Sequence, residues 1–468
     1  MGLSITSCIN EDVNNDPNSV YNTLAETTVS YAQKELSDYM NTPSVNENNF
    51  RLTMQYWQET TYVNESIYDF TNRNVSNNVW SDNYVNILNN LSKSKELINS
   101  FVPAPADVAG WPAKKRNELA IIDIMMVYVY QNMVDTFGNI PYSQSLNLVT
   151  YPLPVYDDAN TIYQNLIVRL SGDIANLGSG ASFGSTELFY AGDVSKWKKF
   201  GNSLLLKLGI ALSDANAALA QTTVNQAISG GVMTSTTDTC QLQYLIDSPN
   251  YSPLYDNLVA SGRDDFYGAA PLIDFMNLKS DARISAYYDP QGTGTTFIGS
   301  PIGVAGDFGD YSHIGAFAYT ETTPGTILSY TEVAFYLAEA AARFTPTLAP
   351  AAYNNAVSAS FNEWGAGAST AAYLTANPYD TSNWKKSIGE QAWVAMYNQA
   401  NTAWNFYRRL DFPVLLAPSN AIPASGGKIP VRLLYPTKEA TTNSNNWSAA
   451  GAAIGGDKLT TKIFWDKF

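Results

Sequence analysis

Apolar residues recur at helical spacing along this chain, and this periodicity constrains the fold more strongly than any other feature of the sequence. The clearest stripe advances by three or four residues at each step: Leu119, Ile122, Met126, Val129 and Met133. Residues at this spacing lie on one face of an α-helix, so the stripe predicts a long helix with one buried side. Gly138 and Pro141 follow the stripe and indicate where that helix ends.

Further segments show the same periodicity and predict additional helices. Their apolar positions are Ile162, Leu166, Leu170, Ile174 and Leu177, then the run 204–212 that starts near Trp197, then Val333, Leu337 and Ala341, and finally Trp393, Tyr397 and Trp404 on one long helix that ends near Arg408 and Arg409. Asp157 and Asp158 precede the first of these segments and favour the positive N-terminal end of a helix. The sequence therefore predicts a mainly α protein.

The longest stretch without helical periodicity covers residues 240–325, where glycine, proline, aspartate and aromatic residues are mixed. Irregular stretches of this length are uncommon in compact proteins unless they carry a function. Aromatic rings placed among glycines in such a stretch are expected to lie at the surface. We therefore predict a ligand-binding role for this irregular region.

The composition of the 468 residues excludes several classes of protein. Hydrophobic residues make up 45% and charged residues 15%, which indicates a packed globular chain and excludes a disordered one. The formal net charge of −15 argues against nucleic-acid binding through phosphate contacts. His313 is the only histidine, which excludes a metal site built mainly from imidazoles. Cys8 and Cys240 are too few for a disulfide framework, and Cys240 is expected to be a buried thiol.

The N-terminal residues indicate a lipid anchor. Residues 3–8 read LSITSC, which matches the end of a lipoprotein signal: an aliphatic residue, two small residues and a cysteine. We predict lipidation of Cys8, with residues 1–19 as anchor and flexible tether and residues 20–468 as a single domain. A diacylated cysteine buries enough methylene for stable membrane attachment. The alternative is that Cys8 is an ordinary thiol. A transmembrane helix is not predicted, because no stretch of the sequence reaches the roughly 18 apolar residues that cross a bilayer.

Six blocks of the sequence, in order, resemble those of the SusD/RagB-like outer-membrane nutrient-binding lipoproteins of Bacteroidetes. The blocks are RNEL through DTFGNIPY at 116–142, WKKFGNSLLL at 197–206, SYTEVAFYLAEA at 329–340, WNFYRR with Pro413 at 404–413, IPVR and YP at 429–443, and FW at 464–465. Asn139 stands where the family usually has aspartate, and the Trp197 block is a variant of the family's motif. The resemblance runs nearly end to end.

The resemblance implies a SusD-like fold, in which four tetratricopeptide-type helix pairs support a long irregular ligand-binding region. It implies a non-catalytic role at the cell surface: the protein captures oligosaccharide or polysaccharide and delivers it to a SusC-type TonB-dependent barrel transporter in the outer membrane. The alternative within the family is a peptide ligand with the same delivery role. The family's ligand site lies on one face, where an early helix-loop segment meets the central irregular region.

Acidic and basic residues within the matching blocks have two interpretations. Glu332 and Glu339, together with Arg408, Arg409 and Arg432, are expected to form buried ion pairs, since a buried guanidinium needs bidentate hydrogen bonds to offset its desolvation. The alternative is an arginine clamp for an acidic sugar.

Candidate ligand-binding residues combine aromatic rings, which present a rigid apolar platform to sugar C–H groups, with side chains that form directed hydrogen bonds. The early segment contributes Trp57, Tyr62, Tyr68, Arg73 and Trp80, and the irregular region contributes Asp265, Phe266, Tyr267, Tyr311, Phe317 and Tyr319. The alternative for the early residues is that Trp57 with Tyr68, or Trp80 with Tyr84, are core aromatics of helices. Some rings of the irregular region are expected to tuck beneath it.

We predict no catalytic residue and no cofactor. His313 is expected to form a hydrogen bond within its loop or to stack on a neighbouring ring. Calcium is conceivable at Asp264–Asp265 or at Asp307 with Asp310, but no EF-hand spacing supports it. Two alternatives of other classes remain: an all-α glycosidase, which needs two carboxyl groups roughly 5–9 Å apart, and a structural lid for the barrel with little affinity of its own.

Overall fold

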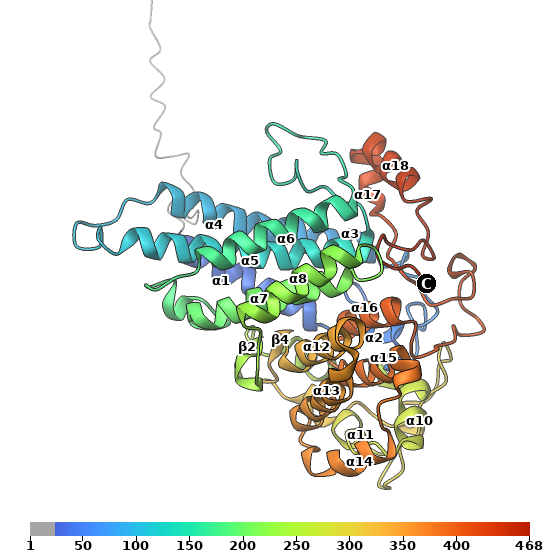
Figure 1. The fold of residues 1–468 in the computed structure, drawn as a ribbon. Helices are drawn as coiled ribbons and strands as arrows, with labels where there is room; N and C mark the ends of the chain where they lie inside the picture. The colour runs from blue at the N-terminus through green and yellow to red at the C-terminus, as the bar shows by residue number, and fades with distance from the viewer. Residues whose placement is uncertain (1–23) are drawn as a thin grey trace, which may run out of the picture.

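The computed structural model describes residues 24–468 and consists mainly of α-helices, which confirms the predicted fold class. The predicted lipidation site Cys8 and the predicted tether 1–19 lie outside the described residues. None of the helices in the described part is long and apolar enough to cross a membrane. In Figure 1 the helices form two stacked groups, with α4 to α8 above and α12 to α16 below.

The first group contains the helices of the N-terminal half. Its bounds are α1 Ala25–Asn41, α2 Phe50–Thr53, α3 Val75–Ser81, the π-helix η2 Asp82–Leu88, α4 Asn89–Ser100, α5 Trp111–Phe137, α6 Ala159–Asn176, α7 Val194–Ala211 and α8 Ala217–Gly230. The second group belongs to the C-terminal half. Its bounds are α12 Tyr330–Phe344, α13 Ala349–Glu363, α14 Thr370–Ala376, α15 Trp384–Ala395 and α16 Ala400–Leu410. The last two helices, α17 Thr437–Thr442 and α18 Ser444–Ala453, lie apart from this group at the top of Figure 1, near α3.

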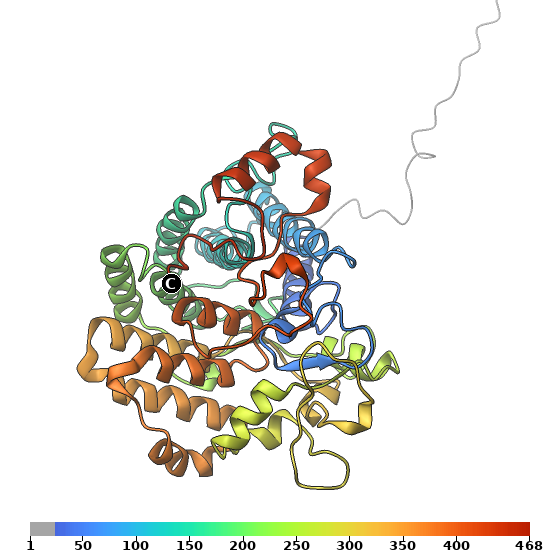
Figure 2. The same cartoon turned by 90° about the vertical axis from the view of Figure 1, so that its right-hand side faces the viewer.

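Successive helices pack against each other in pairs, α5 with α6, α7 with α8, α12 with α13 and α15 with α16. This pairing agrees with the predicted arrangement of tetratricopeptide-type helix pairs. The paired helices form a scaffold, and the remaining segments cover one end and one edge of it (Figures 1 and 2).

Residues 240–325 contain only short elements, as the absence of periodicity predicted. These are β2 Cys240–Leu242, α9 Pro253–Tyr255, the π-helix η5 Asp256–Ala260, β3 Phe266–Gly268, α10 Ala270–Leu278, α11 Ile284–Tyr287, the 3-10 helices η6 Phe308–Asp310 and η7 Ala316–Tyr319, and β4 Gly325–Leu328. Strand β2 pairs with β4, so the two ends of this region are joined to each other. Strand β3 pairs instead with β1 (Trp57–Glu59), which lies far away in the sequence.

The longest predicted helix ends where its sequence indicates, and it begins at Trp111, before the first residue of the apolar stripe. Helix α5 stops at Phe137, and Gly138 follows in the left-handed region at φ 84°, where a side chain would be strained. Helix α6 begins after Asp158, whose carboxylate accepts the backbone N–H of Thr161 at 2.8 Å. Asp157 accepts the backbone N–H groups of Tyr142 and Ser143 and forms no cap hydrogen bond to α6.

The predicted single helix from Trp393 to Trp404 is wrong, because the chain breaks between α15 and α16. Gln399 leaves the helical conformation at φ −124° and ψ 57°. Its side-chain amide donates to buried Glu332 at 2.9 Å, and the Tyr397 ring stacks on Tyr287 with centroids 4.2 Å apart. These tertiary contacts override the local periodicity, which runs through the break.

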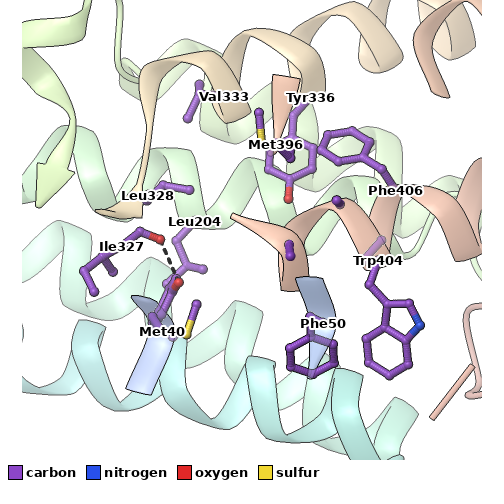
Figure 3. Packing of buried hydrophobic residues seen from close by; sticks show 14 of the residues in the cluster. Met40, Phe50, Leu204, Ile327, Leu328, Val333, Tyr336, Met396, Trp404 and Phe406 are labelled. Atoms are coloured by element: carbon purple, nitrogen blue, oxygen red, sulfur yellow. Dashed lines mark hydrogen bonds between the residues drawn. The ribbon is translucent and has the colours of Figure 1, made fainter. Parts of the chain in front are cut away.

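The hydrophobic core joins distant parts of the chain. Figure 3 shows Met40 and Phe50 of the N-terminal segment together with Leu204 of α7 and Trp404 of α16. Phe50 and Trp404 have ring centroids 4.9 Å apart. Cys240 is fully buried, as predicted.

The predicted buried ion pairs form in part. Arg409 donates to both oxygens of Glu339, the shorter contact being 2.8 Å, and thereby joins α16 to α12. Glu332 pairs with Lys207 at 3.1 Å instead of with an arginine, and Arg432 pairs with Asp457.

The third arginine of that prediction, Arg408, binds backbone oxygens and lies over the Trp404 ring at 3.5 Å. Arg408, Arg409 and Arg432 are only 2%, 4% and 0% exposed, so none of them is available to clamp an acidic sugar. The expectation of buried pairing therefore holds for Glu339 with Arg409. Glu332 and Arg432 are also in ion pairs but with partners that were not predicted, and Arg408 forms no ion pair with the described residues.

Candidate functional site

Strands β1 and β3 bring the two predicted ligand-binding segments together. Their antiparallel register places Glu59 opposite Phe266 and Gln58 opposite Tyr267. The pairing continues beyond the strands, because the Thr60 N–H donates to the Asp265 carbonyl at 2.9 Å. In Figure 2 the blue arrow of β1 lies among the yellow-green segments of the irregular region.

A third segment, residues 303–313, closes against the same strand pair. The Gly303 N–H donates to the Gln58 side chain at 2.8 Å, and the Gly306 N–H donates to the Thr60 carbonyl at 3.0 Å. The Gly268 N–H donates to the Ser312 carbonyl at 2.8 Å. Backbone hydrogen bonds therefore hold the irregular region in a defined position on β1.

A shallow depression, which we call the β1–β3 hollow, lies at the end of this strand pair. Its lining residues are Val45, Glu59, Thr60, Thr61, Tyr62, Arg73, Arg263, Asp265 and Phe266. Four of them belong to the predicted ligand-binding set: Tyr62 and Arg73 of the early segment, and Asp265 and Phe266 of the irregular region. Tyr62 is 69% exposed and is the most accessible aromatic ring of that set.

The charged groups of the β1–β3 hollow neutralise one another. The Arg73 guanidinium donates to the buried Glu65 carboxylate at 2.8 Å. The Arg263 guanidinium lies 2.9 Å from the Asp265 carboxylate, and both of these side chains are partly exposed. Each arginine of the hollow thus already has a carboxylate partner.

Glu59 is the remaining ionisable side chain of the hollow. Burial, followed by the neighbouring Glu65, raises the pKa of Glu59 to about 8. The Ser66 hydroxyl and the Ser66 N–H donate to the Glu59 carboxyl at 2.8 and 2.9 Å. Burial and the neighbouring Glu65 therefore favour the neutral form of the Glu59 carboxyl.

Four predicted residues lie beneath the surface. Trp57, Tyr68, Phe266 and Tyr267 are 1%, 0%, 5% and 0% exposed. The Trp57 indole donates to the Tyr397 hydroxyl at 2.9 Å, and its ring packs on Phe266 with centroids 5.5 Å apart. Protein atoms cover the faces of these rings, which corrects the expectation that they form a platform for a ligand. Phe266 lines the hollow, and Trp57 packs against it. Trp57 lies on a strand, so the helix-core alternative is also corrected for it.

The other predicted residues lie outside the β1–β3 hollow. Trp80 packs against Tyr84 and Phe137 with centroids 5.0 and 5.2 Å apart, as the helix-core alternative predicted. Phe317 packs edge-on against Trp364 at 5.2 Å.

Tyr311 and Tyr319 are both half-buried. Tyr311 contacts Tyr267, with ring centroids 5.0 Å apart. Because successive side chains of a strand alternate in direction, Tyr267 and Tyr311 lie on the face of the strand pair opposite to Glu59 and Phe266.

His313 forms both contacts that the sequence suggested. Its ring stacks on Phe308 with centroids 3.9 Å apart, and Nε2 lies 3.0 Å from the Phe308 carbonyl oxygen. Within residues 24–468, no three side chains of histidine, cysteine, aspartate or glutamate are grouped so that they could hold a metal ion.

The predicted ligand-binding set lacked five residues of the hollow: Val45, Glu59, Thr60, Thr61 and Arg263. Glu59, Thr60 and Thr61 lie within the early segment and Arg263 lies within the irregular region, and all four are polar, so the sequence did contain a signal for them. Val45 lies outside both predicted segments, and no local pattern distinguishes it.

Comparisons with known proteins agree with this architecture. A family described as "starch-binding associating with outer membrane" matches residues 17–436. A solved structure named as a chitin-binding protein is 25% identical, covers 95% of this chain and 100% of its own, and has a TM-score of 0.82.

Two further solved structures share the fold. A chitin-binding SusD homologue from Flavobacterium johnsoniae is 21% identical, covers 94% of this chain and 98% of its own, and has a TM-score of 0.79. A SusD homologue from Bacteroides uniformis is 24% identical, covers 94% of this chain and 99% of its own, and has a TM-score of 0.78. No curated protein matches the chain.

Proposed function

We propose, because this chain belongs to the SusD-like family described as starch-binding and associating with the outer membrane, that it binds a neutral oligosaccharide or polysaccharide at the β1–β3 hollow. We propose further that it is a lipid-anchored cell-surface protein and that it delivers the glycan to a SusC-type TonB-dependent transporter. In this role it binds its ligand without chemical conversion.

The observation that carries the proposal is the chemistry of the hollow. The exposed Tyr62 ring offers an apolar face with a polar edge, which suits the C–H groups and hydroxyls of a sugar. The Arg73, Arg263 and Asp265 side chains supply donors and acceptors in fixed directions. Since each arginine already has a carboxylate partner, the hollow favours an uncharged glycan over an acidic one.

Two structural relatives named as chitin-binding support a glycan ligand. The peptide alternative finds no support in the comparisons. Because the hollow is shallow and a flexible chain loses freedom when it binds, we expect a dissociation constant in the high micromolar range or weaker.

Titration calorimetry of the protein tests this proposal directly. The panel comprises soluble starch, chitin oligosaccharides, a polyuronate and a peptide mixture, with reducing-end release measured in the same samples. Saturable heat with one neutral glycan and no reducing ends supports the proposal. Heat with the polyuronate or the peptides alone would overturn the ligand class, and release of reducing ends would indicate a glycosidase.

A further inference from the structure

The loop that joins α4 to α5 presents a cluster of apolar side chains to solvent. This α4–α5 loop, residues 101–110, reads FVPAPADVAG, and nine of its ten residues are exposed. Phe101, Val102 and Val108 are 52%, 84% and 54% exposed, and Asp107 is the only charged residue of the loop. In Figure 1 the loop forms the left-hand end of the molecule. Apolar residues that are exposed together in one segment mark a contact surface.

Contacts at its base hold the α4–α5 loop in a defined conformation. The rings of Phe101 and Trp111 have centroids 4.8 Å apart, and the Lys115 ammonium donates to the Asn99 carbonyl at 3.3 Å. The Trp111 N–H donates to the Asp107 carbonyl at 3.0 Å. The apolar side chains are therefore presented in a fixed arrangement, and a binding partner does not have to order the loop.

Basic residues are concentrated on both sides of the loop. Residues 93–116 contain five basic and two acidic residues, whereas the chain as a whole has a net charge of −15. The basic residues are Lys93, Lys95, Lys114, Lys115 and Arg116. Among the described residues, Lys115 and Arg116 form no ion pair and donate instead to the backbone carbonyls of Asn99 and Asn176. Their positive charge is therefore available to an anionic surface.

The described chain begins beside the same loop. The Thr28 hydroxyl of α1 lies 2.5 Å from the Ser94 hydroxyl of α4, and the Glu26 carboxylate lies 3.8 Å from the Lys114 ammonium near the start of α5. The proposed lipidation site, Cys8, precedes the first described residue by 16 positions. A chain of that length spans at most about 55 Å. A membrane that holds Cys8 is therefore within reach of this end of the molecule.

We propose that the α4–α5 loop inserts shallowly into a lipid surface with anionic headgroups, as a second contact beside the proposed lipid anchor. Phe101, Val102 and Val108 enter the boundary between headgroups and acyl chains, and Lys115 and Arg116 contact the phosphates. This inference rests on the proposed attachment to the membrane. Attachment at one point leaves the protein free to rotate, whereas a second contact fixes which side of it faces the lipid. Because the anchor keeps the loop close to the surface, a weak contact is sufficient.

Another exposed apolar segment, residues 148–155, lacks the basic residues. Val149 within it is 99% exposed. Residues 142–158 contain no lysine or arginine and end with Asp157 and Asp158, which an anionic surface repels. The combination of exposed apolar side chains, unpaired positive charge and proximity to the start of the described chain therefore favours the α4–α5 loop.

Flotation of the unacylated Cys8→Ser protein with lipid vesicles tests this proposal, because any binding then comes from the protein surface. One set of vesicles is phosphatidylcholine alone, and the other contains a minority of phosphatidylglycerol. The bound fraction is measured over a range of lipid concentrations at physiological salt. We expect the protein to partition onto both sets, and several-fold more strongly onto the anionic one.

Val102→Asn combined with Val108→Asn removes two apolar side chains and leaves the charge unchanged. We expect this variant to partition about ten-fold more weakly onto both vesicle sets. Leu278→Asn is the matched control, because Leu278 is 82% exposed but lies at the end of α10, at the lower right of Figure 1. It should partition like the parent Cys8→Ser protein.

Lys115→Gln combined with Arg116→Gln tests the electrostatic part. It should weaken partition onto the anionic vesicles about ten-fold and leave partition onto phosphatidylcholine unchanged. Thermal melts show whether each variant keeps its fold. Glycan calorimetry of the same variants should be unchanged, so that a failure of the glycan proposal and a failure of this one are recorded in separate experiments.

The proposal is overturned if the parent protein does not float at the highest lipid concentration, or if the variant lacking both valines floats as well as the parent. In the second case the exposed side chains would be left for a protein partner. Equal weakening by Leu278→Asn would also overturn it, because lipid binding would then not be specific to the α4–α5 loop.

Discussion

Tyr62 and Trp57 belong to the same early segment, yet their side chains differ in solvent exposure. Tyr62 is 69% exposed beside the β1–β3 hollow, while Trp57 is 1% exposed and donates a hydrogen bond to Tyr397. A substitution at Tyr62 should therefore affect binding, and one at Trp57 should affect stability.

We expect Tyr62→Ala to weaken binding of the responsive glycan about ten-fold, because it removes the exposed ring at an energetic cost of roughly 1–1.5 kcal/mol. The melting temperature should stay within about 1 °C, since the side chain is mostly in solvent. Titration calorimetry and a thermal melt provide the two readings. Tyr151→Ala is the control, because Tyr151 is also exposed but does not line the hollow. Equal loss of affinity in both variants would place the site elsewhere.

The Glu59 carboxyl makes stability depend on pH. Its folded-state pKa of about 8 lies above the ordinary value of 4.5, so the folded protein binds this proton more tightly than the unfolded chain does. The resulting stabilisation is complete below about pH 4.5 and is lost as the pH rises to about 8.

We expect Glu59→Gln to reduce the fall in melting temperature between pH 5 and pH 9, and to make the variant more stable than the unmodified protein at pH 9. Thermal melts across this range are the measurement. Asp274→Asn, at an exposed position of α10, is the comparison and should leave the pH profile unchanged. A Gln variant with the original pH dependence would show that Glu59 ionises normally in the fold.

At the scale of elements, the buried pair of Arg409 and Glu339 ties α16 to α12. Both side chains are nearly inaccessible, and Arg343 also donates to Glu339 at 2.9 Å. The two guanidinium groups hold the pKa of Glu339 below its ordinary value despite its burial.

We expect Glu339→Gln to lower the free energy of unfolding by about 3–5 kcal/mol, because it leaves buried guanidinium charge without a counter-charge. Denaturant unfolding at pH 7 measures this loss. Glu96→Gln, in an exposed pair with Lys93 on α4, should cost no more than about 1 kcal/mol. A loss at Glu339 as small as that at Glu96 would mean that the helix interface does not depend on the ion pair.

The elements also differ in how well local sequence describes them. Helix α5 ends before its terminal glycine as predicted, but its apolar stripe does not mark a single buried side, because every residue from Ala120 to Phe137 is buried. The break between α15 and α16 cannot be predicted from apolar periodicity, because it depends on the hydrogen bond from Gln399 to Glu332 of α12. Helix α18 lies in a stretch rich in asparagine and glycine, which showed no apolar stripe.

At the scale of the whole molecule, the proposed role requires the binding surface to stay close to the outer membrane. We expect alkyne-palmitate labelling of the protein when it is expressed in a Bacteroidetes host with a lipoprotein leader before Cys8. The Cys8→Ser variant should lose the label and move from the membrane fraction to the soluble fraction, because one thioether-linked lipid anchor is then missing. A control variant, Cys240→Ser, should keep the label. Membrane retention of unlabelled Cys8→Ser would point to attachment through a protein partner alone.

The helical class, the C-terminal end of α5 and the family could be predicted from the sequence, because periodicity, terminal residues and short motifs are local properties that can be read along the chain. The sequence also placed Tyr62, Arg73 and Asp265 in the right segments for the hollow. The solvent exposure of the aromatic side chains, in contrast, depends on the tertiary structure. Trp57 and Tyr267 have the composition of a binding platform, but the β1–β3 pairing joins segments about 200 residues apart and covers them. Burial and long-range pairing depend on all parts of the fold at once, and no local pattern encodes them.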